Sequence, residues 1–264
     1  MGYPVTFTDQ TGFAITLPKA PQRIISVVPS QTELLHALGL QQRVVGITKF
    51  CLYPRQWRSS LPFVGGTKNI KPEVVAQLQP DLIIGNKEEN QKENILALRA
   101  QYPVWLSDIF DLPDALAMIK AVGHITQTAE KATTLAHNIG TAFNALTGLR
   151  PVRALYLIWH KPFMAAASNT FINQMLRYAG FSNVLAGHQR YPELTEQQII
   201  DLNPEVILLS SEPFPFKQKH VAMLNALCPN AKVTLANGEL FSWYGSRLLK
   251  SPPYFLQLRA QLGL

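Results

Sequence analysis

One pattern occurs twice in this sequence, at residues 70–86 and again at residues 194–210. Each copy begins with polar residues and a helical stretch, continues with Leu-x-Pro and an acidic residue, and ends in an apolar run. The proline stops the helix, and an unbroken apolar run is typical of a parallel strand that is buried on both faces. Two copies of one helix–strand unit, far apart in one chain, predict a duplicated α/β lobe.

The residues upstream of each copy also repeat, and in the same order. Residues 30–46 and 168–187 both read as a serine-led helix, a glycine that stops it and a short strand. The apolar run RIISVV at residues 23–28 is matched by RALYLI at residues 153–158. Strands that alternate with helices predict a parallel sheet in each lobe.

Two local signals refine the first lobe. Residues 4–17 alternate in polarity around a polar turn, which predicts an opening β-hairpin. Ser30 is placed to cap a helix that carries Glu33 at its third position, and Gly39 follows as the residue that ends that helix.

A helical segment lies between the two copies. We predict one helix over residues 111–119 and a second over residues 128–147, whose apolar side chains recur every three or four positions. Roughly twenty residues at about 1.5 Å each would span about 30 Å. The predicted fold class is therefore α/β, with two similar Rossmann-like lobes that have parallel-rich sheets and are joined by a single long backbone α-helix. We divide the chain into an N-terminal lobe (1–110), a helical connector (111–150) and a C-terminal lobe (151–264).

Composition excludes several classes of protein. Hydrophobic residues make up 47% of the chain and charged residues 16%, which excludes intrinsic disorder. No apolar run reaches the roughly 18 residues that a membrane helix needs. The formal charge of +7 comes from scattered Lys and Arg, so nucleic acid is not a predicted partner. Cys51 and Cys228 are too few for a disulfide framework or a zinc site, and their redox state stays open.

Sequence motifs of catalysis are absent. The chain has no nucleophile elbow, phosphate-binding loop or HExxH pair, so we do not predict an enzyme or a cofactor. The six histidines show no metal-ligand spacing, so we predict no metal site. His160 follows Trp159 at a predicted strand end and is the one histidine that we retain as a contact to a metal or ligand.

Two α/β lobes imply a cleft between them. Ligands of open α/β sheets bind beyond the carboxyl ends of the strands, and pockets favour domain interfaces. The segments at those ends are rich in aromatic rings, which offer contact area, and in cations, which favour carboxylates or phosphates. The predicted ligand-binding residues are Ser30, Gln31, Lys49, Phe50, Tyr53, Thr67, Lys68, Asn86 and Lys87 in the first lobe, and Trp159, His160, Phe163, Tyr191, Glu212, Phe214, Trp243, Tyr244 and Arg247 in the second.

Four runs carry a family resemblance: VTFTDQTGFAITLPKAPQRIISVVPSQTELLHALGL, VVGITKFCLYP, VGGTKNIKPEVVAQLQPDLIIG and LTEQQIIDLNPEVILLS. They resemble the class III periplasmic substrate-binding proteins of ABC importers, also called the helical-backbone metal receptor superfamily. The resemblance covers residues 4–262. It implies two lobes joined by one rigid helix, and a ligand such as vitamin B12, haem or a ferric siderophore.

Within that family the chain looks most similar to vitamin B12-binding members. Phe50, ahead of Tyr53 and Pro54, corresponds to an aromatic residue that these members carry before a Tyr-Pro pair. Phe163, after a proline, corresponds to an aromatic residue in their second lobe. The resemblance therefore implies a corrinoid ligand.

The chain also departs from those members. They often carry a tryptophan where this chain has Gly66 or Thr67, and another where it has Asn86. Here Trp159 and Trp243 supply indoles from the other lobe. The added lysines suit an anionic chelate, so a ferric siderophore or haem is the alternative ligand within the same importer class.

The resemblance also implies a partner and a location. Family members dock onto arginines of a membrane permease through an acidic residue on each lobe, and the candidates here are Glu88, Glu89, Glu93 and Glu212. We expect a monomer that is periplasmic, or lipid-anchored at the cell surface, if a leader was removed ahead of the present start. If none was removed, the alternative is a cytoplasmic enzyme or chelate-handling factor on the same scaffold.

Overall fold

The computed structural model describes residues 2–264, so Met1, the first residue of the predicted N-terminal lobe, lies outside the described residues. The chain forms two compact units. Unit 1 comprises the chain up to Ile109, Pro113–Asn138 and Tyr244–Arg247, and unit 2 comprises Phe110–Leu112, Ile139–Trp243 and Leu248–Leu264. The predicted three-part division at residues 110 and 150 stays a prediction.

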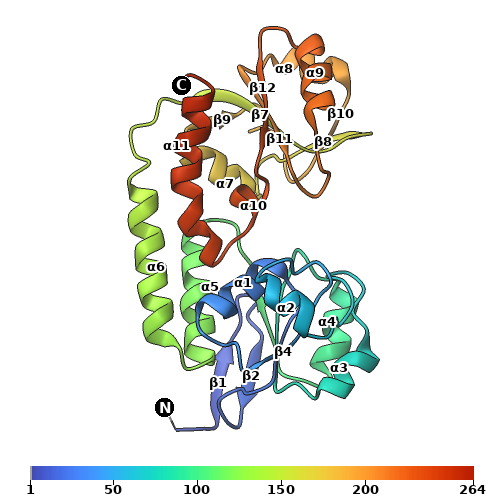
Figure 1. Cartoon of the computed structure of the whole chain (residues 1–264), viewed down its shortest axis with the longest axis vertical. Helices are drawn as coiled ribbons and strands as arrows, with labels where there is room; N and C mark the ends of the chain where they lie inside the picture. Colours follow the sequence, from blue (N-terminus) through green and yellow to red (C-terminus); the bar gives the residue numbers. More distant parts are fainter. Residues whose placement is uncertain (1) are drawn as a thin grey trace. The chain divides into compact units, whose positions relative to one another are not determined.

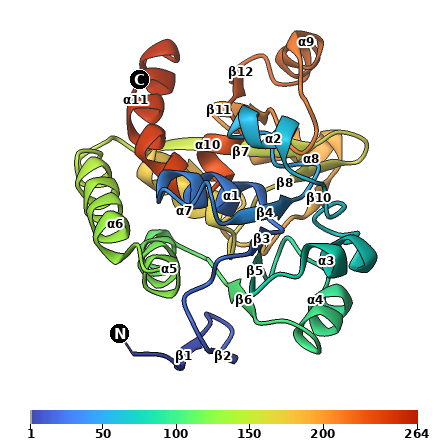
Figure 2. The same cartoon turned by 60° about the horizontal axis from the view of Figure 1, so that its bottom comes forward.

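Unit 1 is built on a four-stranded parallel sheet with the order β4-β3-β5-β6. Its strands are β3 (Ile24–Ser26), β4 (Val44–Ile47), β5 (Leu82–Asn86) and β6 (Val104–Ser107). Its helices are α1 (Pro29–Ala37), α2 (Arg55–Ser60), α3 (Pro72–Leu78) and α4 (Lys92–Arg99), and α3 and α4 lie side by side (Figures 1 and 2). The apolar faces of these elements meet in a core that includes Ile25, Val75 and Ile83.

The predicted opening hairpin is confirmed. Strands β1 (Val5–Thr8) and β2 (Ala14–Leu17) pair antiparallel, with Val5 opposite Leu17. The buried carboxylate of Asp9 accepts hydrogen bonds from the backbone N–H groups of Thr11 and Phe13 and forms an ion pair with Arg99. This carboxylate therefore fixes the turn and ties the hairpin to α4.

Unit 2 has a six-stranded mixed sheet with the order β10-β8-β7-β11-β12, and β9 pairs with β7. The strands are β7 (Val152–Trp159), β8 (Phe163–Ala165), β9 (Phe181–Asn183), β10 (Glu193–Leu194), β11 (Val206–Ser210) and β12 (Lys232–Ala236). Strands β8 and β10 run antiparallel to their neighbours, and the others are parallel. The α/β class with parallel-rich sheets is confirmed.

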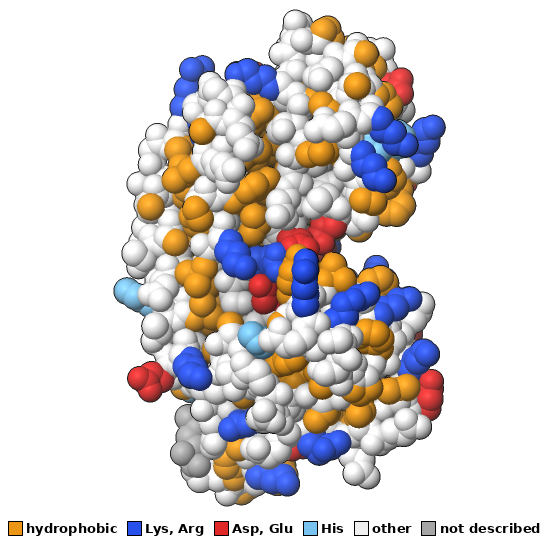
Figure 3. All heavy atoms as spheres, in the orientation of Figure 1, with side chains coloured by type: hydrophobic (Ala, Val, Ile, Leu, Met, Phe, Trp, Pro, Cys, Tyr) orange, Lys and Arg blue, Asp and Glu red, His pale blue; other side chains and the backbone are white. Residues whose placement is uncertain are grey.

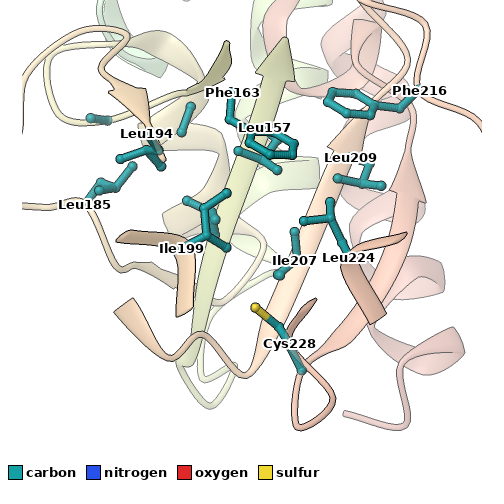
Figure 4. Close-up of a cluster of buried hydrophobic side chains, with 14 residues drawn as sticks. Leu157, Phe163, Leu185, Leu194, Ile199, Ile207, Leu209, Phe216, Leu224 and Cys228 are labelled. Carbon is teal, nitrogen blue, oxygen red and sulfur yellow. The ribbon is translucent and has the colours of Figure 1, made fainter. Parts of the chain in front are cut away.

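An apolar core in unit 2 includes Ile199 and Leu224, each from a different helix. Leu157 on β7 and Ile207 and Leu209 on β11 lie among the side chains of this core in Figure 4. The helices are α7 (Phe171–Tyr178), α8 (Glu196–Leu202), α9 (Gln218–Leu227), α10 (Glu239–Ser242) and α11 (Ser251–Gln261), with a 3-10 turn η1 (Ser246–Lys250) before α11.

The sequence repeat has matching contacts in the two units. In unit 1 the side chain of Arg23 donates to the carbonyl of Leu78 at the end of α3, and the Arg23 N–H donates to Asp81. In unit 2 the side chain of Arg153 donates to the carbonyl of Leu202 at the end of α8, and its N–H donates to Glu205. The predicted likeness of the two lobes therefore extends to how an arginine closes each helix–strand junction.

Two predicted helix caps are wrong. Helix α1 begins at Pro29 with Val28 as its N-cap and no side-chain cap bond, so Ser30 lies inside the first turn and forms no capping box. Proline suits the first helical position because it has no N–H to satisfy there. Helix α7 is capped by Thr170 and not led by Ser168. The predicted glycine stop at Gly39 is confirmed by its φ of 84°.

The connecting helices differ in length from the prediction. Helix α5 (Leu112–Ile125) extends beyond residue 119, and α6 (Ala129–Asn144) has 16 residues, which at about 1.5 Å each give about 24 Å. A Cβ on Gly123 of α5 would collide with Ala132 of α6, so this glycine allows the two helices to pack closely. Helix α6 carries the chain from unit 1 into unit 2. Among the described residues, no helix is long and apolar enough to cross a membrane.

Candidate functional site

Several predicted site residues lie at the carboxyl ends of strands in the two sheets. In unit 1, β4 leads into Lys49 and Phe50, and β5 leads into Lys87. In unit 2, β7 leads into His160, and β11 leads into Glu212. Figure 3 shows Lys and Arg side chains beside hydrophobic ones over the face in view, consistent with the excess of basic residues.

A cavity of about 600 Å³ lies in unit 1 next to the end of β4. It contains two aromatic side chains, Phe50 and Phe63, which are 51% and 39% exposed. Its lining residues are Lys49, Phe50, Phe63, Gly65, Gly66, Thr67, Lys68, Asn69 and Lys71. The structure thus brings together four predicted ligand-binding residues, namely Lys49, Phe50, Thr67 and Lys68.

Three other predicted residues of unit 1 are buried. The Gln31 side chain donates to the carbonyl of Gly85 and to the hydroxyl of Ser107, at 3.1 and 2.6 Å. The Asn86 side chain donates to Ser107 and accepts from the N–H groups that follow β5. Ser30 is also buried, in the first turn of α1. Gln31 and Asn86 therefore form buried hydrogen bonds at the carboxyl ends of β5 and β6.

The segment Tyr244–Arg247 belongs to unit 1 and carries two predicted residues into it. The Tyr244 hydroxyl donates to Glu89 at 2.5 Å, and burial, followed by the charge of Glu89, raises the pKa of Tyr244 well above its usual value. The Arg247 side chain donates to Glu33 at 2.7 Å, and its guanidinium lies 4.4 Å from the centre of the Tyr53 ring. Tyr53, Tyr244 and Arg247 are therefore already engaged by protein groups.

An aromatic cluster marks the corresponding edge of unit 2. The His160 ring lies 5.1 Å from Phe163 and 5.7 Å from Phe214, measured between ring centres. Trp159 is 38% exposed and packs edge-on against Phe214 at 5.6 Å. The cluster consists of Trp159, His160, Phe163, Phe214, Phe216 and His220.

The two histidines of the cluster favour their neutral forms. Burial lowers the pKa of His160, and the charges of His220, Lys161 and Lys219 lower it further. Burial and the charge of Lys219 also lower the pKa of His220, whose Nδ1 accepts the backbone N–H of Lys217. Among the described residues, no group of three or more His, Cys, Asp or Glu side chains is placed to hold a metal ion.

The remaining predicted residues of unit 2 lie in other surroundings. The Glu212 carboxylate accepts hydrogen bonds from the Trp243 indole at 2.9 Å and from the Ser242 hydroxyl at 2.6 Å. Trp243 is buried, and its bond to Glu212 orients the indole. Tyr191 is half-buried, with the Arg190 guanidinium 5.2 Å from its ring centre.

The four predicted docking glutamates also differ in environment. Glu88 and Glu93 are exposed in unit 1, whereas Glu89 is half-buried against Tyr244 and Glu212 is half-buried against Trp243.

Cys51 and Cys228 are both free thiols and both buried, one in each unit. Burial raises the pKa of each thiol.

The family model described as "Periplasmic binding protein" matches residues 24–226, which is most of the chain. The chain belongs to this periplasmic binding protein family. The predicted family is thereby confirmed, and the match includes both copies of the internal repeat.

The relatives of this periplasmic binding protein differ in the ligand that their names give. An uncharacterized ABC transporter substrate-binding lipoprotein, YvrC of Bacillus subtilis, is 26% identical over 78% of this chain and 69% of its own. A vitamin B12-binding protein of Vibrio parahaemolyticus is 26% identical over 75% of this chain and 74% of its own. A periplasmic heme binding protein from Pseudomonas aeruginosa shares the fold, with a TM-score of 0.78, 21% identity, and coverage of 89% of this chain and 91% of its own.

Several residues of both surfaces were missed by the sequence analysis. Phe63 and Lys71 line the cavity of unit 1, and Phe216 and His220 belong to the cluster of unit 2. Phe63 directly precedes the Val64-Gly65-Gly66 run, and Lys71 directly precedes the proline that starts α3. The position of Phe63 beside a glycine pair, and of Lys71 beside a helix start, is the sequence feature that could have identified these two residues.

Proposed function

We propose that this periplasmic binding protein is the substrate-binding component of an ABC importer that captures a bulky, metal-centred chelate. The family match and the name of the Bacillus subtilis relative support the importer role. In this role the protein works outside the cytoplasmic membrane, as a monomer, and delivers its ligand to permease subunits. Glu88 and Glu93 are the exposed members of the predicted docking set.

One observation carries the proposal. Each unit presents exposed aromatic rings together with cations at the carboxyl ends of its own parallel strands, Phe50 with Lys49 in unit 1 and Trp159 with Lys161 in unit 2. Aromatic faces bind a large flat ligand through contact area and stacking. Ligands of open α/β sheets bind at this edge. A surface of this kind suits a ligand larger than an amino acid or a simple sugar.

A corrinoid is the first candidate ligand. The Vibrio parahaemolyticus relative is named as a vitamin B12-binding protein, and it aligns with three quarters of this chain. The family resemblance matches Phe50 and Phe163 to aromatic residues of such proteins. Phe50 is exposed in the unit 1 cavity, whereas Phe163 is buried in the core of unit 2. Under this assignment the protein's rings would contact the macrocycle.

An iron chelate, either haem or a ferric siderophore, is the second candidate. The lysines of the unit 1 cavity favour a ligand with carboxylate or phenolate groups. His160 offers a neutral imidazole beside aromatic rings, as its lowered pKa indicates. A neutral imidazole is also the form that ligates iron or cobalt.

The experiment is a calorimetric titration of the purified protein with cyanocobalamin, haemin and a panel of ferric siderophores. We expect one of these chelates to bind with a dissociation constant of micromolar or lower, and the absorbance of the purified protein to report any retained ligand. Failure of every chelate to bind contradicts the proposal. Chemical turnover of a bound chelate would instead favour an enzyme on the same scaffold.

A further inference from the structure

The cavity of unit 1 concentrates positive charge. Lys49, Lys68 and Lys71 line it, and no acidic residue is among the described residues that do. None of the three lysines forms an ion pair with any described residue. Like charges around one cavity repel each other, and a bound anion relieves that repulsion.

We propose that this cavity binds the anionic groups of the chelate, so that the substrate is haem, a ferric siderophore or a corrinoid with free carboxylates, and not a corrinoid whose side groups are neutral amides. The inference rests on the proposed function and adds the charge of the substrate to it. Carboxylates and phenolates are the groups that lysine ammonium ions recognise through charge-assisted hydrogen bonds. A neutral amide-decorated macrocycle offers these lysines no such partner.

The backbone of the cavity is held in place before any ligand binds. Asn90 donates to the carbonyl of Thr67, and Asn94 donates to the carbonyl of Lys68, each at 2.9 Å. The N–H of Lys49 donates to the carbonyl of Gly65, also at 2.9 Å. Two loops that carry lysines are thus fixed to neighbouring elements, and such preorganisation reduces the entropy cost of binding.

Two adjacent glycines leave the cavity open. Gly65 has a φ of 105°, and a Cβ there would collide with the carbonyl oxygen of Asn69. A Cβ on Gly66 would lie 3.0 Å from the Phe50 ring and 3.6 Å from Cε of Lys49. Any larger side chain at Gly66 would therefore displace the ring and the ammonium group that the ligand is proposed to contact.

Each aromatic ring of the cavity lies close to a cationic side chain. A ligand bound there therefore contacts an apolar ring and a positive charge together. The Lys49 Nζ is 5.1 Å from the centre of the Phe50 ring. The Arg58 guanidinium is 5.9 Å from the centre of the Phe63 ring and donates to the carbonyl of Lys49. A flat apolar body with acidic groups at its rim satisfies both features, because the rings take the body and the ammonium ions take the rim.

The test compares each acid with its methyl ester, which loses the negative charges and gains only a methyl group on each carboxyl. Dicyanocobyrinic acid is compared with its heptamethyl ester, and haemin with its dimethyl ester, by titration of the full chain. We expect the acid of at least one pair to bind about tenfold or more tightly than its ester, since the ester removes the charge-assisted bonds. We also expect the affinity for that acid, and not for its ester, to fall on raising the salt concentration.

Variants assign the effect to the cavity. Lys68→Gln and Lys71→Gln should each weaken binding of the acid by about fivefold, as expected for part-exposed ion pairs, and leave the ester unchanged. Lys120→Gln removes the same charge from an exposed position on α5 and should change neither. Melting curves of all three variants check that the fold is intact.

The outcomes separate the two proposals. If neither acid binds more tightly than its ester, if cyanocobalamin binds and neither acid does, or if Lys120→Gln weakens binding of the acid as much as Lys68→Gln does, the inference about charge is overturned while the proposed function stands. If none of the four compounds, cyanocobalamin or any ferric siderophore binds, the proposed function fails and the inference fails with it.

Discussion

Arg247 donates a hydrogen bond from Nε to Oε2 of Glu33 across 2.7 Å, and both residues belong to unit 1 although they lie 214 positions apart in the sequence. Their side chains are 7% and 17% exposed. The guanidinium also lies over the Tyr53 ring. A late segment of the chain is therefore fixed to an early helix by a largely buried ion pair.

Removing the arginine should destabilise unit 1. Arg247→Ala leaves the carboxylate of Glu33 half-buried without its partner, and we expect a loss of about 2 to 4 kcal/mol in the free energy of unfolding. The measurement is denaturant unfolding followed by circular dichroism. Arg55→Ala, at an exposed position on α2, should change the stability by no more than about 0.5 kcal/mol. Equal effects of the two substitutions would show that the ion pair contributes nothing specific.

The matched arginines should have matched and local effects. Arg23→Ala and Arg153→Ala each remove hydrogen bonds to the last carbonyl of a helix, and each should cost about 1 kcal/mol. Hydrogen exchange should accelerate in α3 and β5 for the first variant and in α8 and β11 for the second. Acceleration of both regions by either variant would contradict this assignment.

The two adjacent glycines should respond differently to alanine. Gly65→Ala forces a positive φ and a clash with Asn69, so we expect a loss of about 1 to 3 kcal/mol in stability. Gly66→Ala needs only a small shift of the Phe50 ring and should cost less. Melting temperatures of the two variants check the order, and a less stable Gly66→Ala would contradict it.

The histidines of the aromatic cluster should make stability depend on pH. Their pKa values are lowered in the folded state, so the unfolded chain binds protons first as the pH falls. The stabilisation is thus fully present above the unfolded value of about 6.5 and is lost as the pH falls through the folded values. The double variant His160→Gln/His220→Gln should show a smaller loss of stability between pH 7.5 and pH 5 in denaturant unfolding. An unchanged slope would exclude these two groups as its source.

The exposed indole of unit 2 should contribute to ligand affinity. Trp159→Ala removes a ring that packs against Phe214, and we expect binding of the chelate to weaken by about 1 to 3 kcal/mol. Isothermal titration measures the change. Phe13→Ala, an exposed aromatic residue of the opening hairpin, is the control that should leave the affinity unchanged. An unaltered affinity of Trp159→Ala would remove this residue from the binding surface.

Local patterns predicted much of the fold. The Leu-x-Pro-acid junctions, the hairpin and the stop at Gly39 were identified because each depends on residues adjacent in sequence. The antiparallel strands β8 and β10 were missed, since they are two or three residues long and pair through contacts that no local periodicity marks.

The candidate site was harder to predict for a physical reason. Residues that follow a strand can turn inward or outward, and their type alone does not decide which. Gln31 and Asn86 turn inward and complete hydrogen-bond networks, whereas Lys49 and Phe50 turn outward into a cavity. The hydrogen bonds between Glu212 and Trp243 and between Glu89 and Tyr244 join segments that are far apart in the sequence. No local spacing of residues predicts such bonds.

The assignment of Tyr244–Arg247 to unit 1 has a consequence for biosynthesis and for dissection of the protein. No single scission of the polypeptide yields two fragments that each hold one whole unit. Unit 1 begins to be synthesised first, yet it is complete only after the ribosome has translated Tyr244–Arg247 near the end of the chain. A truncation just upstream of Tyr244 would therefore destabilise unit 1 as well as shorten unit 2.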